Sequence, residues 1–218
     1  MKAESMKHLQ KMHSMCKEDM GYFKELIEAI IRIESETNGK GKFKIWDYVG
    51  KDKIRLAMEC VYHDGGFKVA TDGYMLITLK EEYDPELERR LMRKDGTLMD
   101  PETRYPKWRD VIPNPELEEM TSVVLDFAKI REIEADFKVK KKLRDVLGYI
   151  KVNEMYTFKL PLFLKMVRFM EHIGTNELLV VKDRRTAALA ISGENRGILM
   201  PVYTDPDMEY QLVYSLYL

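Results

Sequence analysis

Cysteine is scarce in this sequence, and long apolar stretches are absent. Only Cys16 and Cys60 occur among 218 residues, so a framework of several disulfides is excluded and a reducing cytoplasm is the expected location. No stretch approaches the roughly 20 apolar residues that a membrane-spanning helix needs, and the charged N-terminus has no signal-peptide core. We therefore expect neither secretion nor membrane insertion.

An excess of either charge is also missing. The 36 basic residues almost balance the 37 acidic ones, which gives a formal net charge of -1. Any surface that binds nucleic acid would therefore have to be a local patch. Hydrophobic residues make up 45% and charged residues 33%, as in ordinary globular proteins, and a chain of this length builds a core without disulfides or a structural metal.

The first 80 residues combine an extension, a helix and three strands. Residues 1–20 are polar and rich in methionine and lysine, which is typical of an extension. Apolar residues at helical spacing predict a helix from about 22 to 35. An alternating pattern predicts a strand over 54–62, and His63-Asp64-Gly65-Gly66 predicts a tight turn. Two more strands are expected at 67–71 and 74–79.

The rest of the chain repeats this order after a polar connection. Charged residues and prolines over 80–120 predict a surface segment, in which the aromatic stretch 104–113 docks on the body. Strands are expected at 123–127, 156–160, 177–182, 186–191 and 198–203, and helices at 128–147 and from Pro161 to Gly174. Residues after 203 are long enough for one more strand.

No pattern in the sequence predicts an active site. A phosphate-binding glycine loop, a CxxC pair, an HExxH helix and a nucleophile elbow are all missing, so we expect no enzyme, no cofactor and no metal. His8, Met12, His13 and Cys16 would suit a soft metal if they met on one helix, but a solvated arm is the preferred interpretation. A hydrolase using His63, Asp64 and Asp72 stays open, although turns favour these residues for backbone reasons.

A basic run in the second half has two interpretations. Its residues are Lys138, Lys140, Lys141, Lys142 and Arg144. On a helix they cover a broad face of the kind that gathers contacts to phosphates. The alternative is a solvated helix whose charge Glu132, Glu134 and Asp136 balance.

Three segments resemble motifs of the bacterial DNA polymerase sliding clamp, the beta subunit that confers processivity. Val69-Ala70-Thr71-Asp72-Gly73-Tyr74-Met75-Leu76 is similar to the clamp motif ATDGHRL. Arg104-Tyr105-Pro106-Lys107-Trp108-Arg109-Asp110-Val111-Ile112-Pro113 is similar to the connector GRFPDYRRVLP. Ile198-Leu199-Met200-Pro201-Val202-Tyr203 is similar to the closing VVMPMR. The three segments also occur in the order of the clamp.

The resemblance implies an α+β, DNA-clamp-like fold with helices packed on curved antiparallel sheets. It further implies a non-enzymatic protein that binds DNA without sequence preference through the basic run, forms homo-oligomers and docks peptides of polymerases, clamp loaders or repair proteins. Carried over by position, the peptide pocket comprises Thr71, Gly73, Tyr74, Met75, Leu76, Pro106, Val111, Ile198, Met200, Pro201 and Val202. Core packing is an equal alternative for Leu76 and Ile198. Methionine suits such grooves because its thioether side chain adapts to different partners.

The chain also departs from the clamp pattern. It is too short for the three domains of a clamp subunit, and Tyr74, Met75, Asp110 and Tyr203 replace basic motif residues. We expect an N-terminal extension at 1–20 and two clamp-like halves at 21–113 and 114–218. The expected function is a replication or repair processivity factor or scaffold. The alternative is an interaction module, or a clamp decoy, that no longer encircles DNA.

Overall fold

The computed structural model describes residues 43–51, 54–116, 119–143, 147–152, 156–181, 186–202 and 211–216. All of them belong to the compact unit Phe43–Leu218. The extension predicted at 1–20, the helix predicted at 22–35 and the soft-metal candidates His8, Met12, His13 and Cys16 lie outside the described residues.

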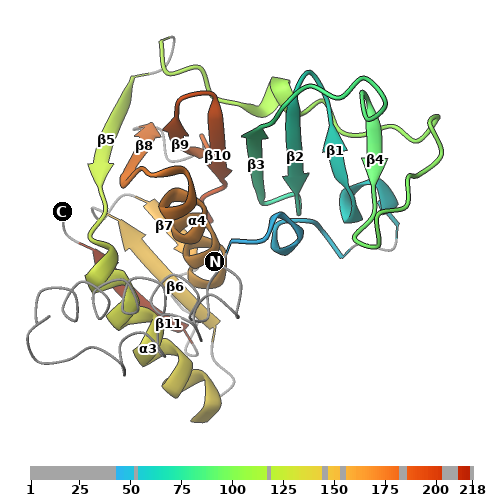
Figure 1. The fold of residues 1–218 in the computed structure, drawn as a ribbon. Coiled ribbons are helices and arrows are strands. Elements are labelled where there is room, and N and C mark those ends of the chain that lie inside the picture. The colour runs from blue at the N-terminus through green and yellow to red at the C-terminus, as the bar shows by residue number, and fades with distance from the viewer. Residues whose placement is uncertain are drawn as a thin grey trace, which may run out of the picture. The chain divides into compact units, whose positions relative to one another are not determined.

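An eight-stranded antiparallel sheet, in the order β4-β1-β2-β3-β10-β9-β8-β5, is the largest element (Figure 1). Its strands are β1 (Val61–His63), β2 (Phe67–Thr71), β3 (Met75–Lys80), β4 (Arg90–Met92), β5 (Met120–Val124), β8 (Glu177–Val181), β9 (Ala188–Ser192) and β10 (Asn195–Leu199). A second sheet, β11-β6-β7, contains β6 (Leu147–Val152), β7 (Tyr156–Lys159) and β11 (Gln211–Leu216). Two α-helices, α3 (Phe127–Leu143) and α4 (Leu160–Ile173), complete the described part. The predicted α+β class is confirmed.

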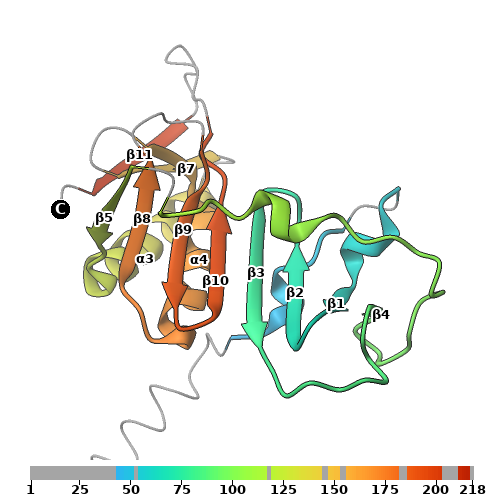
Figure 2. The same cartoon turned by 90° about the horizontal axis from the view of Figure 1, so that it is seen from above.

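Helix α4 supplies the centre of the main core. Pro161 lies in its first turn, and Gly174 ends it in a left-handed conformation with φ 74°. The helix contacts β10 and β3 of the large sheet and β6 and β7 of the small one (Figure 2). A Cβ atom at Gly197 of β10 would lie 2.7 Å from the ring of Phe169, so the glycine allows helix and strand to approach closely.

Strands β3 and β10 join the first half of the chain to the second (Figure 2). Their pairing runs from Arg196 opposite Thr78 to Leu199 opposite Met75. The two halves therefore share one continuous sheet, and a domain boundary at residue 113 stays a prediction.

The connector, residues 104–113, docks on one face of this sheet, as the aromatic stretch predicted. Tyr105, Trp108 and Ile112 pack against Val69, Leu76 and Ile198. The indole Nε1 of Trp108 donates a hydrogen bond to Asp64 at 2.9 Å. The Arg109 guanidinium stacks 4.1 Å from the Trp108 ring. A buried aromatic with a satisfied N–H is a stable anchor for a segment that is otherwise polar.

Several predicted boundaries are wrong. Four of the nine residues predicted as a strand over 54–62 form a 3₁₀ helix, η3 (Leu56–Glu59), and only the last two belong to β1. The helix predicted to 147 ends at Leu143, because Gly148 belongs to β6 and packs under Phe137, whose ring would lie 2.4 Å from a Cβ there. The segment predicted as connection contains β4 and a second 3₁₀ helix, η4 (Trp108–Val111). The strand expected after 203 is confirmed as β11.

Candidate peptide-binding site

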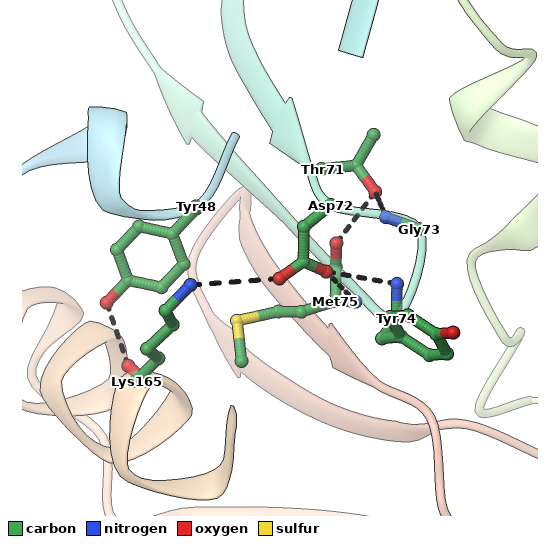
Figure 3. Close-up of polar contacts among 7 residues, drawn as sticks. All are labelled: Tyr48, Thr71, Asp72, Gly73, Tyr74, Met75 and Lys165. Atoms are coloured by element: carbon green, nitrogen blue, oxygen red, sulfur yellow. Dashed lines mark hydrogen bonds and ion pairs between the residues drawn. The ribbon is translucent and has the colours of Figure 1, made fainter. Parts of the chain in front are cut away.

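The turn between β2 and β3 is closed by its own side chains (Figure 3). One oxygen of the Asp72 carboxylate accepts hydrogen bonds from the backbone N–H groups of Tyr74 at 3.0 Å and Met75 at 2.9 Å. The Thr71 hydroxyl accepts from the N–H of Gly73 at 3.1 Å and donates to the Met75 carbonyl at 2.7 Å. Gly73 has φ 88°, a conformation that favours glycine. The turn therefore holds the exposed Tyr74 on a fixed backbone.

Helix α4 is tied to this turn through Lys165. Its ammonium group lies 3.7 Å from the second oxygen of Asp72. The Tyr48 hydroxyl donates to the backbone carbonyl of Lys165 at 2.8 Å. Burial raises the pKa of Tyr48, so this hydroxyl stays a neutral donor. The arrangement connects the core of the molecule to the surface turn (Figure 3).

The end of β10 lies directly beside the turn. The N–H of Met200 donates to the Tyr74 carbonyl at 2.9 Å, and the N–H of Val202 donates to the Thr157 carbonyl at 2.7 Å. Tyr74 is 54% exposed and Met200 is 40% exposed. The Lys159 ammonium lies 5.0 Å from the centre of the Tyr74 ring. Two large apolar side chains are thus exposed at neighbouring backbone positions.

A hollow with a volume of about 520 Å³ borders the turn. A Cβ atom at Gly73 would lie 3.2 Å from the Met58 methyl group and 3.9 Å from the Arg55 guanidinium, and both residues line the hollow. Its described lining is Ile54, Arg55, Leu56, Ala57, Met58, Met99, Thr103, Arg104, Tyr105 and Pro106. Ile54 is 92% exposed, which is unusual for a large aliphatic side chain.

The structure brings the three sequence segments together but distributes their side chains differently. Gly73, Tyr74, Pro106, Val111 and Met200 are exposed, whereas Pro201 and Val202 are half-buried. The remaining predicted pocket residues, Thr71, Met75, Leu76 and Ile198, are buried. Leu76 and Ile198 lie beneath the connector, and Met75 packs in the main core with the residues of α4. The accessible surface therefore includes fewer residues than the predicted peptide pocket.

Sequence reasoning did not find the other side of the hollow. The sequence pattern predicts a strand at Ile54, Leu56 and Met58 and a polar connection at Met99, all of which line the hollow. No local pattern distinguishes these residues from a half-buried strand, because the hollow forms only when segments distant in sequence meet.

The basic run is described only in part. Lys138, Lys140, Lys141 and Lys142 lie on α3. The Lys138 ammonium pairs with Glu134 at 2.6 Å, and Glu134 also accepts from Arg168 at 2.7 Å. Burial alone would raise the pKa of Glu134, but the hydrogen bonds and charges of Lys138 and Arg168 outweigh it and lower that pKa. The side chains of Lys140, Lys141 and Lys142, and all of Arg144, lie outside the described residues.

The residues considered for hydrolysis occupy separate structural positions. His63 Nδ1 lies 2.8 Å from Glu81, and Asp64 accepts from Trp108. His63 lies opposite Lys68 of β2, and Asp72 comes four residues further along, so strand geometry alone separates them by roughly 13 Å. Within the described residues, no three His, Cys, Asp or Glu side chains are placed to hold a metal ion, and no helix is long and apolar enough to cross a membrane.

Comparison with known proteins gives a structural likeness only. No protein-family model and no curated protein matches the sequence. Solved structures that resemble the fold include the DNA polymerase III subunit beta of Pseudomonas aeruginosa, with a TM-score of 0.49, 14% identity and coverage of 72% of this chain and 61% of that one. The sliding clamp of the same organism bound to griselimycin has a TM-score of 0.46, with 14% identity over the same shares.

The DNA polymerase III subunit beta of Borrelia burgdorferi, in complex with a natural product, has a TM-score of 0.47 and 10% identity. It is covered over 60% of its length, by 73% of this chain. The chain thus spans about three-fifths of the length of the clamps it resembles.

Proposed function

We propose that this chain is a sliding-clamp-like replication or repair protein, a processivity factor or scaffold, that acts by docking short partner peptides. The observation that carries the proposal is the hydrogen bond from Met200 to Tyr74, which sets two exposed apolar side chains beside the hollow. We call this surface the turn site. It comprises Gly73, Tyr74, Met200 and the hollow lined by Met58, Pro106 and their neighbours.

The turn site suits an extended peptide. Peptide anchors are apolar side chains, and alternate residues of an extended chain point to the same side, roughly 7 Å apart. One anchor reaches the hollow while the next covers Tyr74 and Met200. The turn is already hydrogen-bonded to itself, so little backbone ordering opposes binding. Polymerase, clamp-loader and repair proteins are the proposed sources of the peptide.

DNA contact through α3 is the second element of the proposal. Lysines on one helix gather phosphate contacts, and such binding ignores base sequence. The alternative function, a peptide-binding module without DNA, is favoured by one observation. Glu134 already neutralises Lys138, which reduces the charge available to phosphates.

A titration tests peptide docking directly. The probe is the capped heptapeptide Ser-Leu-Ser-Phe-Ser-Asn-Ser, followed through the methyl signals of ¹³C-methyl methionine in the protein. We expect saturable shifts of Met58, Met99 and Met200. Met200→Ala and Gly73→Val should each weaken binding by about tenfold, since truncating or filling the centre of a small site removes its main contacts.

The matched control is Val124→Ala on β5, because Val124 is a 55% exposed apolar residue three strands away from β10. It should leave the affinity unchanged. Circular dichroism shows whether each variant is folded. A folded parent protein that gives no methyl shifts at about 1 mM peptide, a concentration well above typical weak affinities, overturns the proposal.

A further inference from the structure

Two arginines belong to the hollow of the turn site. Arg55 and Arg104 are part of its lining, and none of the described lining residues is acidic. Arg104 is exposed, and within the described part of the chain its guanidinium makes no ion pair. The Lys159 ammonium lies over the Tyr74 ring at the neighbouring end of the site. Guanidinium groups form strong, geometrically defined hydrogen bonds with carboxylates.

Tyr105, which also lines the hollow, has a firmly held ring. The Tyr105 hydroxyl is buried and has no partner among the described residues. The ring is held in place by stacking on Tyr62, with centroids 4.7 Å apart and an angle of 21° between the planes. Burial raises the pKa of Tyr105, so the hydroxyl keeps its proton. The hydroxyl itself is shielded from solvent, so the ring of Tyr105, and not its O–H group, forms part of the surface that a peptide contacts.

We infer that the peptide docked at the turn site carries a carboxylate next to its apolar anchors, and that Arg104 receives it. The inference rests on the proposed function and adds the charge of the ligand to it. A peptide fits better than a nucleic acid, because most of the lining is apolar: Ile54, Leu56, Ala57, Met58, Met99 and Pro106. An extended peptide places residues one, three and five on the same side, so two anchors and an acid at alternate positions meet the site together.

Three capped heptapeptides that differ only at one side chain test this inference. They are Ser-Leu-Ser-Phe-Ser-Xaa-Ser with Asp, Asn or Lys at Xaa, so the variable residue carries the only charge. We expect the Asp peptide to bind about five- to tenfold more tightly than the Asn peptide, and the Lys peptide to bind most weakly. The preference should shrink when sodium chloride is raised from about 50 to about 500 mM, because salt screens charges near the surface.

Two variants assign the preference to the hollow. Arg104→Gln should reduce the ratio between the Asp and Asn affinities to about one, whereas a merely structural effect would weaken both peptides alike and keep the ratio. The matched control is Arg89→Gln, since the Arg89 side chain is 81% exposed and does not line the hollow.

The outcomes separate this inference from the proposed function. Equal binding of the three peptides, or an Arg104→Gln variant that keeps the Asp preference, overturns the carboxylate inference and leaves docking intact. Absence of binding by all three overturns both. A third outcome is that a short oligothymidylate displaces the Asn and Asp peptides equally well from the parent protein but not from Arg104→Gln. This result also overturns the inference and assigns the hollow to nucleic acid.

Discussion

The ammonium group of Lys165 lies 3.7 Å from the carboxylate of Asp72, so helix α4 and the β2–β3 turn are held together by one ion pair. The other oxygen of that carboxylate organises the turn backbone. Asp72 is therefore the residue through which the core of the protein fixes the exposed Tyr74. Because both side chains of the pair are partly exposed, the hydrogen bonds within the turn contribute more than the ion pair.

Asp72→Ala should loosen the turn and weaken peptide binding. The change removes the acceptor for two backbone N–H groups, each worth about 1 kcal/mol, so we expect a loss of affinity of up to about thirtyfold. Amide hydrogen exchange at Tyr74 and Met75 should become faster. Asp72→Asn keeps an acceptor oxygen and should preserve protection, and Lys165→Met should have only a small effect. Unchanged exchange in Asp72→Ala would contradict the role of this carboxylate.

Gly197→Ala should destabilise the fold by about 1–3 kcal/mol, the usual cost of overpacking a core. The new methyl group would lie 2.7 Å from the Phe169 ring and 2.9 Å from the Met166 sulfur. Urea unfolding of the parent and the variant measures the difference. Phe169→Leu in the same chain should restore part of the lost stability by making room. If Gly197→Ala is as stable as the parent, α4 does not pack on β10 as closely as described.

The sequence predicts turns and helix ends correctly where the backbone conformation requires one residue type. Gly65 and Gly66 have φ 65° and 74° in the predicted β1–β2 turn, and Asp64 and Phe67 exchange backbone hydrogen bonds across it. Gly174 ends α4 as expected. In both places glycine is the residue that adopts the required conformation at no steric cost, so the sequence alone is informative.

For the candidate site, the sequence predicts which segments lie together but not which of their side chains are accessible. Successive residues of a strand face opposite sides, so Met75 and Leu76 cannot both line one groove. Leu76 lies under the connector and Met75 in the main core. The period-two pattern from Ile54 to Met58 predicts a strand, whereas Leu56–Glu59 form a short 3₁₀ helix with three residues per turn. The pattern therefore did not indicate the hollow. Contacts between residues 54–58 and 99–106 are long-range, and no local pattern encodes them.

The DNA proposal predicts loss of binding when the basic run is reversed. Lys140→Glu, Lys141→Glu and Lys142→Glu in one chain should abolish retention of double-stranded DNA, because phosphate contacts release counterions and each lost cation weakens binding. For the parent, affinity should fall steeply with added salt and ignore base sequence. Gel shifts and fluorescence anisotropy at several salt concentrations measure both. Lys94→Glu, in the exposed loop after β4, is the control.

Binding that survives the triple reversal, or that depends strongly on sequence, would count against DNA contact by α3. A parent that binds the peptide probe and does not bind DNA would instead favour the interaction module.

Glu134 should make the protein sensitive to acid. Lys138 and Arg168 hold its pKa below the ordinary value of 4.5 despite its partial burial. The unfolded chain then binds a proton at a higher pH than the folded protein does, so stability falls as the pH drops from about 4.5 through the lower folded pKa.

The variant Glu134→Gln lacks the carboxylate that binds this proton. The melting temperature of the parent should therefore exceed that of the variant near pH 6, and the difference should shrink towards pH 3, as followed by circular dichroism. Glu132→Gln, at an exposed position on the same helix, should parallel the parent over this range. A constant difference between the parent and Glu134→Gln from about pH 6 to pH 3 would show that the ion pairs of Glu134 with Lys138 and Arg168 do not set its titration.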